Sequence, residues 1–174
     1  MDLEKRLTSV KLWLSDVDGV LTDGRIILDN AGNESKFFDV RDGHGLAMLK
    51  RHGIRTGFIT GRTSEVVNIR AKELGADFVA QGSRDKTKDL MIIVKHAGVS
   101  LEQVAYMGDD VVDLPVLRRV GFATAPSDAH ADVLQHVHYV AKAKGGRGAV
   151  REVSEMILKA QGKWEAMLGE LLSV

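Results

Sequence analysis

Short apolar runs alternate with longer amphipathic stretches along nearly the whole chain, and this rhythm constrains the fold more than any other feature. The short runs have the length of buried strands, and the longer stretches have the periodicity of helices that bury one face. Strands that alternate with helices form βαβ units, so the sequence predicts an α/β protein with a mostly parallel sheet. The predicted strands cover residues 11–17, 55–60, 77–80, 104–108, 121–123 and 137–140, and the predicted helices cover residues 45–52, 64–74, 86–97, 114–120, 129–136 and 148–161.

One segment interrupts this alternation directly after the first predicted strand. Residues 25–29 and 35–40 flank Asn30-Ala31-Gly32-Asn33-Glu34, whose asparagines and glycine supply turn chemistry, so we predict an inserted β-hairpin at about residues 24–40. The hairpin would either stand over the carboxyl edge of the sheet or form a plain surface flap, and the sequence leaves both open. No repeat or linker divides the 174 residues, so we expect a single domain over residues 1–174.

The overall composition excludes several classes of function. The chain has 24 Lys plus Arg and 24 Asp plus Glu, and a net charge of zero gives no attraction to nucleic acid or to an anionic membrane. The absence of cysteine excludes disulfides and thiolate metal sites and fits a reducing compartment. Residues 1–11 contain no apolar signal core, and no run approaches the roughly 20 apolar residues of a membrane helix. We therefore expect a cytoplasmic protein with no nucleic-acid or membrane partner.

Two carboxylates, Asp16 and Asp18, stand where the first apolar run ends, and a glycine follows them at once. On a strand, side chains two residues apart point to the same face, so the two acids would crowd each other at the carboxyl end of the strand. Like charges this close are unfavourable unless a cation or a shared proton relieves them. The pair therefore indicates a hard metal ion and chemistry on an anionic substrate.

Other polar residues follow the later strands or begin a helix. They are Thr60, Gly61 and Arg62 after the second strand, Lys86 at the start of a helix, and Asp109, Asp110 and Asp113 after a later strand. Taken singly, each has an ordinary alternative as a helix cap, a turn or a solvated lysine. In open α/β sheets, however, ligands bind beyond the carboxyl ends of the strands, and that one edge collects the whole set.

The set supports phosphoryl transfer. Mg²⁺ takes one or two protein carboxylates together with waters and phosphate oxygens. One carboxylate can act as a nucleophile and form an aspartyl-phosphate, while a second donates a proton to the leaving oxygen and later activates water. A hydroxyl, backbone N–H groups and a lysine can hold the remaining phosphate oxygens. Asp16 and Asp18 suit the two carboxylate roles if Asp16 is the nucleophile that binds the metal.

The order of these residues resembles the four motifs of the haloacid dehalogenase superfamily of phosphatases. More narrowly, the chain resembles the family of 3-deoxy-D-manno-octulosonate 8-phosphate phosphatases over about residues 10–163. The narrower resemblance depends on Asp16–Gly24, Val40–Gly43, Thr60–Arg62, Gln81-Gly82, Gly108–Pro115 and Gly145–Glu152. It implies a Rossmann-like three-layer fold with helices on both faces of the sheet, and a Mg²⁺-dependent phosphatase of lipopolysaccharide inner-core biosynthesis.

The resemblance also implies a role for each matching residue. Asp16 would attack phosphorus and bind Mg²⁺, and Asp18 would be the general acid and base and lend its backbone carbonyl to the metal. Thr60 and Gly61 would grip the phosphoryl group, and Lys86 would neutralise the nucleophile and the phosphate. Asp109 would bind Mg²⁺. Asp113 would contact Lys86 or a water on the metal, and Asp110 is a further candidate for such a water.

The resemblance further implies that the chain lacks a separate cap domain and forms a homotetramer, in which the hairpin of one subunit helps to cover a neighbour's site. The glycine-rich stretch Gly145–Gly148 would then open a mobile C-terminal tail, about residues 145–174, that closes over the substrate. Arg147 is suited to bind the substrate's carboxylate or phosphate, because guanidinium offers a bidentate fork. The ordinary alternative is a loop that leads into a helix.

The choice of substrate depends on Arg62, since related phosphatases of nine-carbon keto-deoxy sugar acid 9-phosphates tend to have an acidic residue after Thr-Gly. Arg62 fits the eight-carbon type better, and the nine-carbon type remains the enzyme alternative. Alternatives from other classes are a phosphate-accepting receiver domain and an inactive homologue that serves as an oligomerisation module. His44 departs from the family pattern, which has an apolar residue there, and its role stays open.

Overall fold

Six parallel strands form the centre of the computed structural model, which describes residues 2–173. The order across the sheet is β5 (Phe78–Ala80), β4 (Arg55–Ile59), β1 (Leu12–Ser15), β6 (Val104–Met107), β7 (Phe122–Ala125) and β8 (Tyr139–Val140). The order reverses direction at β1, between β4 and β6, and such a switch point is where open α/β sheets bind ligands. The acids that follow β1 therefore lie at the point that the topology favours for a site.

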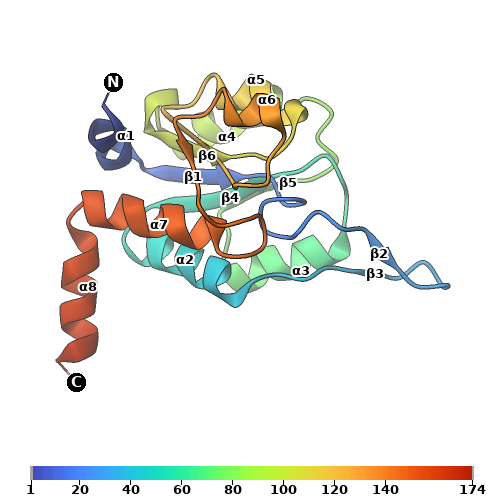
Figure 1. Ribbon diagram of the computed structural model, residues 1–174, viewed down its shortest axis with the longest axis horizontal. Helices are drawn as coiled ribbons and strands as arrows, with labels where there is room; N and C mark the ends of the chain where they lie inside the picture. Colours follow the sequence, from blue (N-terminus) through green and yellow to red (C-terminus); the bar gives the residue numbers. More distant parts are fainter. Residues whose placement is uncertain (1, 174) are drawn as a thin grey trace.

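Side chains alternate across the sheet and form two apolar clusters. Trp13, Phe58 and Met107 point to one face, where they join the helices α2 (Val40–Arg51), α3 (Glu65–Leu74) and α7 (Ala149–Ala160). Leu14 and Tyr106 point to the other face, toward α4 (Lys86–Ala97), α5 (Leu114–Leu117) and α6 (Ala131–Leu134) (Figure 1). The strands are buried on both faces, as parallel strands covered by helices must be. This arrangement confirms the predicted three-layer α/β fold.

The long helices follow the predicted positions, with shifts at the ends. The first face is covered by α2 (Val40–Arg51), α3 (Glu65–Leu74) and α7 (Ala149–Ala160), and the second by α4 (Lys86–Ala97), α5 (Leu114–Leu117) and α6 (Ala131–Leu134). The start of α2 was predicted wrongly, because Gly43 and Gly45 disfavour a helix interior. Packing overrides that preference: a Cβ at Gly45 would come within 3.1 Å of the Arg151 backbone in α7.

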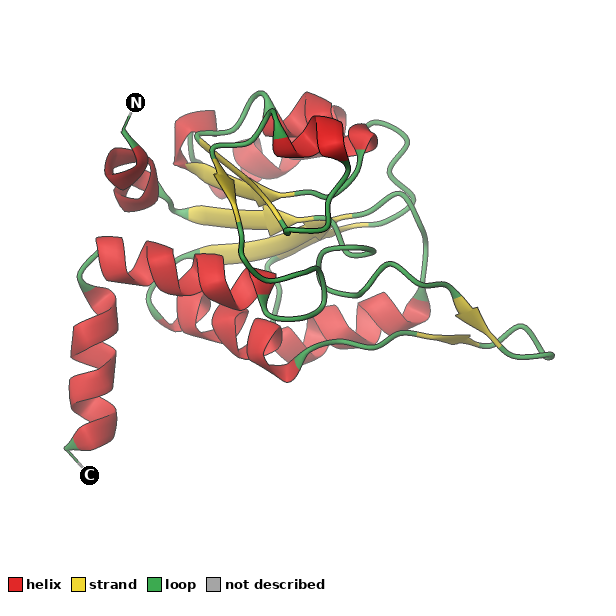
Figure 2. Ribbon diagram, viewed as in Figure 1, coloured by secondary structure: helices red, strands yellow, loops and turns green. Residues whose placement is uncertain are grey.

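The inserted hairpin is present and is shorter than predicted. Its strands β2 (Ile27–Leu28) and β3 (Glu34–Ser35) pair antiparallel, and the chain reaches α2 at Val40. Figure 2 shows the hairpin projecting away from the body of the molecule. Both alternatives considered for the hairpin apply, each to a different part of it. The tip projects outward like a surface flap, whereas Glu34 and Lys36, at and after β3, contact residues at the carboxyl edge of the sheet.

The chain termini contain two helices that the pattern analysis did not predict, α1 (Leu3–Ser9) and α8 (Lys163–Leu172). In Figure 1, α8 turns away from α7 at the end of the molecule opposite the hairpin. Two 3₁₀ turns, η1 (Leu101–Gln103) and η2 (Val111–Asp113), flank β6. Within residues 2–173, no helix is long and apolar enough to cross a membrane.

Candidate active site

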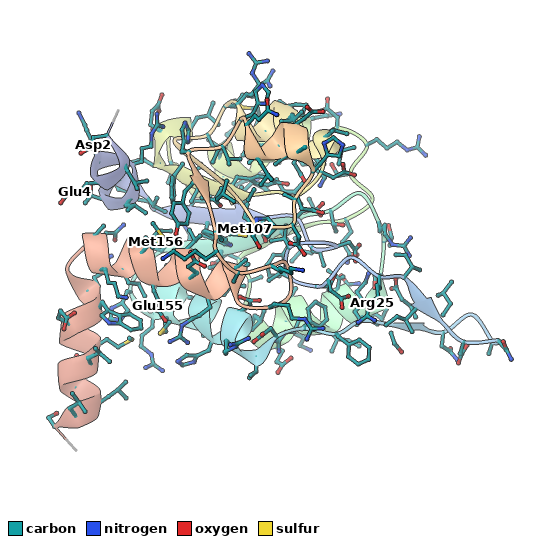
Figure 3. The ribbon with its side chains drawn as sticks, viewed as in Figure 1. Asp2, Glu4, Arg25, Met107, Glu155 and Met156 are labelled. Carbon is teal, nitrogen blue, oxygen red and sulfur yellow. The ribbon has the colours of Figure 1, made fainter. Side chains whose placement is uncertain are left out.

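A pocket of about 470 Å³ opens at the carboxyl edge of the sheet, where β1, β4 and β6 end. In Figure 3, Met107, the last residue of β6, lies at the centre of the body, and Arg25 lies where the hairpin leaves it. The pocket collects residues from five separate stretches of the chain, and most of them are the residues singled out from the sequence. Its lining consists of Asp16, Asp18, Gly24, Thr60, Gly61, Arg62, Ser83, Arg84, Lys86, Asp109, Asp110 and Val112.

The floor of the pocket is a buried network of charges centred on Lys86. Its Nζ donates to Oδ2 of Asp16 (2.7 Å) and to Oδ1 of Asp113 (2.8 Å). Asp113 is fully buried and also accepts from the Tyr106 hydroxyl (2.7 Å) and from the backbone N–H of Asp109 (3.1 Å). The other oxygen of Asp16 accepts from the Val17 N–H (2.6 Å), so both of its oxygens are held and the plane of the carboxylate is fixed.

Three carboxylates share this floor with one ammonium group, and burial together with the excess negative charge raises the pKa values of Asp16 and Asp109. Burial, together with the neighbouring Asp113, raises the pKa of Asp16 to about 6. Burial and the charges of Asp16 and Asp113 raise the pKa of Asp109 to about 7. Burial opposes the charge on Lys86, but Asp113 and Asp16 outweigh it and raise the lysine's pKa. The side chains of the floor therefore carry more negative than positive charge when all are ionised.

Oxygen atoms of Asp16, Asp109 and Asp113 lie within 4.8 Å of one another, and this cluster has room for a cation. Oδ1 of Asp109 is buried and has no hydrogen-bond partner among the described residues, which is costly for a carboxylate unless an ion completes it. Gly19 allows this approach: its φ is +91°, and a Cβ there would collide with the Asp109 carboxylate. All the donors are oxygens, the ligands that Mg²⁺ prefers.

The wall of the pocket is built from ion pairs with the hairpin. Lys36, directly after β3, donates to Oδ1 of Asp18, and its side chain is only 1% exposed. Arg62 lies 3.0 Å from Oε1 of Glu34 and 3.8 Å from Oδ2 of Asp18. Glu34 also accepts from the hydroxyl of Ser64. The base of the hairpin thus contacts the candidate acid and base of its own chain.

Two small groups face the floor from the end of β4. Thr60 is buried, with 2% exposure, and it lines the pocket together with the exposed Gly61. The loop before α4 lies beside Thr60, because the Ser83 N–H donates to the Thr60 carbonyl (3.0 Å). The pocket lining therefore includes a hydroxyl and a glycine backbone from the end of β4, as well as Asp16 and Lys86.

Three of the residues considered from the sequence lie at the margin of the site or outside it. Asp110 lines the pocket but is exposed, and its side chain caps η2 through the Val111 N–H (2.7 Å). The side chain of Arg147 is 64% exposed, lies 3.6 Å from Asp23 and does not line the pocket. His44 is exposed on α2, so an apolar residue is not needed there.

The segment that begins at Gly145 packs closely against the loop after β1. A Cβ at Gly145 would collide with the backbone oxygen of Gly19, and the Gly146 N–H donates to the Val20 oxygen (2.8 Å). The glycines therefore let this segment pack against the loop that carries the two acids. The chain then continues as α7, whose Val150 and Ile157 belong to the core.

Some contributors to the site were missed by sequence analysis. Tyr106 reads as one more apolar residue of a buried strand, and Glu34 and Lys36 read as polar residues of a hairpin. Asp42, also missed, is buried and accepts from the N–H groups of Gly148 (3.1 Å) and Arg151 (2.8 Å), which fixes the start of α7. The only signal for Asp42 was its position in the motif Val40–Gly43.

Comparison with known proteins agrees with this geometry. A family model described as haloacid dehalogenase-like hydrolase matches residues 59–153. The chain therefore belongs to the haloacid dehalogenase-like hydrolases.

Relatives that match nearly the full length of the chain identify a narrower family within this class. The 3-deoxy-D-manno-octulosonate 8-phosphate phosphatase KdsC of Yersinia pestis is 44% identical over 168 residues, which are 97% of this chain and 90% of that protein. The chain thus belongs to the 3-deoxy-D-manno-octulosonate 8-phosphate phosphatase family. A phosphatase of that name from Moraxella catarrhalis, crystallised with magnesium, phosphate and KDO, superposes with a TM-score of 0.94 at 42% identity, covering 97% of each chain. A probable YrbI family phosphatase from Pseudomonas syringae gives a TM-score of 0.95 at 45% identity, covering 98% of this chain and 97% of that one.

Proposed function

We propose that the chain is a Mg²⁺-dependent phosphatase that hydrolyses 3-deoxy-D-manno-octulosonate 8-phosphate to the free sugar acid and inorganic phosphate. The observation on which this rests most is the buried Asp16–Lys86–Asp113 network beside the unpaired oxygen of Asp109. It combines a fixed carboxylate, a fixed ammonium and oxygen ligands for a cation in one pocket. Family membership supplies the substrate, and the free sugar acid would serve lipopolysaccharide inner-core biosynthesis.

Asp16, Asp109 and the backbone carbonyl of Asp18 would hold Mg²⁺ in this proposal. The fit is supported by the crowded oxygens and by the raised pKa values of Asp16 and Asp109, which show how unfavourable the uncompensated charges are. When bound, the ion supplies positive charge that offsets the charge of the phosphate and of the nucleophile. Asp113 is assigned to Lys86, because the two are in direct contact, and not to the metal.

The reaction would proceed in two displacements. In the first, an oxygen of Asp16 forms a bond to phosphorus while the bond to the sugar oxygen breaks, and Asp18 donates its proton to that oxygen. In the second, Asp18 takes a proton from water, the resulting hydroxide attacks phosphorus, and the bond to Asp16 breaks to release phosphate. Lys86, Thr60 and the backbone at Gly61 would hold the other phosphate oxygens during both displacements.

Lys86 has a second task in this scheme, which its contacts explain. The lysine bonds Asp16 at 2.7 Å and must remain cationic, and Asp113 with the Tyr106 hydroxyl keeps it in place. A nucleophile with neutralised charge is approached more easily by the anionic phosphate than a free carboxylate is. Asp113 thus acts through Lys86 and does not need to touch the substrate.

We also propose a homotetramer. The hairpin exposes a group of large apolar side chains, Ile26, Leu28 and Phe37, and Val40 follows it. Exposed apolar groups gathered on one projecting element are typical of an interaction surface. A second subunit would cover them, and it would place the hairpin near a neighbour's site as well as its own. The compartment we propose is the cytoplasm.

A phosphate-release assay tests the function. We expect purified protein to release phosphate from the eight-carbon ester when Mg²⁺ is present and not after chelation with EDTA. A clear preference for the nine-carbon sugar acid 9-phosphate would replace the proposed substrate with the enzyme alternative. A long-lived phosphorylated protein without phosphate turnover would instead indicate a receiver domain.

A further inference from the structure

Three cations line the pocket, and two of them are already neutralised by carboxylates. Lys86 lies 2.7 Å from Asp16 and 2.8 Å from Asp113. Arg62 lies 3.0 Å from Glu34 and 3.8 Å from Asp18. Arg62 therefore belongs to the wall, and its charge is largely neutralised by Glu34 of the hairpin and by Asp18, the candidate acid and base.

Arg84 is the third cation, and it differs from the other two. Within residues 2–173, no carboxylate oxygen lies within 4.0 Å of its guanidinium group. The neighbouring Asp85 is not available, because its side chain accepts from the N–H groups of Thr87 (3.0 Å) and Lys88 (3.1 Å) and caps α4. Arg84 is thus an exposed, uncompensated cation two residues from the lysine of the floor.

The shape of the surface extends the pocket in the direction of Arg84. A second hollow of about 350 Å³ shares Arg84, Lys86 and Val112 with the main pocket, and Asp85, Thr87 and Pro115 complete its lining. The Asp85 side chain in this lining is the one that caps α4. A molecule whose phosphate lies against Asp16 and Lys86 therefore has space to continue past Arg84 and Val112. Val112 is 58% exposed and gives this passage an apolar side on which a sugar ring can pack.

We propose that Arg84 binds the carboxylate of the sugar acid and thereby selects acidic substrates among phosphate esters. The assignment rests on the proposed function, because that substrate has one anionic group at each end. The phosphate is taken by the floor, and the carboxylate needs a second cation with free donors. Guanidinium offers two parallel N–H groups to a carboxylate. Arg147, the sequence-based candidate for this role, is turned toward Asp23 and lies outside the lining.

The test compares Arg84→Gln and Arg84→Lys with Arg118→Gln. Arg118 is a matched control because it is also an exposed arginine without an ion pair among the described residues, and it does not line the main pocket. Each variant is assayed with the eight-carbon ester, with the methyl ester of its carboxylate, and with p-nitrophenyl phosphate, which has no carboxylate. Kinetics with p-nitrophenyl phosphate report whether the fold and the floor are intact.

We expect Arg84→Gln to raise KM for the acid about 10- to 100-fold with little change in kcat, since a remote contact of this kind is made in both ground and transition states. The variant should no longer distinguish the acid from its methyl ester, whereas the wild type and Arg118→Gln should. Arg84→Lys should fall between them, because lysine keeps the charge but loses the fork. In the Arg84 variants, the change in KM for p-nitrophenyl phosphate should be much smaller than the change for the acid, and Arg118→Gln should match the wild type with every substrate.

Two results overturn the proposal, and they differ from each other. If the wild type hydrolyses the eight-carbon acid and Arg84→Gln keeps the same KM and the same discrimination against the methyl ester, the Arg84 assignment is wrong while the proposed function stands. If the wild type hydrolyses p-nitrophenyl phosphate but not the sugar acid ester, the proposed substrate is wrong and the assignment falls with it.

Discussion

The floor and the wall of the pocket hold their charges in different ways. The floor, formed by Asp16, Lys86 and Asp113, is buried, and its residues come from the ends of strands and the start of a helix in the core. In the wall, Lys36 is also buried, but the carboxylates of Asp18 and Glu34 are partly exposed, and Arg62, which lies beside both, is 47% exposed. The hairpin that supplies Glu34 and Lys36 projects from the body of the molecule (Figure 2). An ion pair that is buried on both sides is costly to break, whereas a pair that reaches the surface, such as Arg62 with Glu34, contributes little. The floor therefore suits unchanging chemistry, and the wall suits adjustable contacts with substrate.

The largest effect is expected in the floor, for Asp16→Asn. We expect turnover to fall by about 10⁴-fold or more, because an amide is a poor nucleophile and a weaker metal ligand. The measurement is kcat with the eight-carbon ester and with p-nitrophenyl phosphate. Near-normal activity would show that the floor does not supply the nucleophile.

The matching change in the wall is Asp18→Asn, for which we expect a fall in kcat of about 10²- to 10⁴-fold. Mg²⁺ affinity should remain close to that of the wild type, since the backbone carbonyl survives the substitution. Calorimetric titration of Mg²⁺ into both variants checks the difference between them. Equal losses of metal affinity would contradict the division of roles between Asp16 and Asp18.

Stability should separate the two regions further. Asp113→Asn removes the negative charge that pairs with a buried ammonium and replaces one of two acceptor oxygens with an NH₂ donor, so we expect a loss of about 3 kcal/mol in the free energy of unfolding. Glu34→Gln is the comparison in the wall, where Lys36 keeps its pair with Asp18 and the other charged partner, Arg62, is half-exposed, so we expect a smaller loss of about 1 kcal/mol. Urea denaturation without metal measures both, and similar losses would break the comparison.

The smallest effect concerns pH and metal. Asp16 and Asp109 have pKa values raised to about 6 and about 7, above the value near 3.9 of an unfolded chain, so the folded protein binds more protons between these values. Without metal, stability should therefore fall as the pH rises from about 4 through 7. Millimolar Mg²⁺ should raise Tm by several degrees at about pH 8 and by less at about pH 5.5. Thermal denaturation with and without Mg²⁺ measures the shift.

Asp109→Asn should remove most of this dependence on Mg²⁺, while Asp132→Asn, which changes an exposed carboxylate outside the pocket, should leave it intact. A Tm increase with Mg²⁺ that is the same at both pH values would show that these carboxylates do not take up the ion.

Much of the fold was predictable, because apolar periodicity reports directly on burial. The predicted range of α4 agrees with the structure, and the order of strands and helices is right. The prediction failed where local preference and packing disagree, as at the start of α2, where two glycines lie inside a helix because Arg70 and α7 come too close for side chains. It also failed at α1 and α8, whose short apolar faces are a weak signal.

The sequence by itself determined which residues gather at the catalytic edge, because parallel strands bring their carboxyl ends together whatever connects them. Asp16, Thr60, Lys86 and Asp109 could be selected for that reason. Only the tertiary structure decided which charged groups form pairs. Asp113, which also accepts from Tyr106, holds Lys86, and Glu34 pairs with Arg62. Arg84 has no carboxylate partner among the described residues. Pairing depends on distances between segments far apart along the chain, and residue order does not contain these distances.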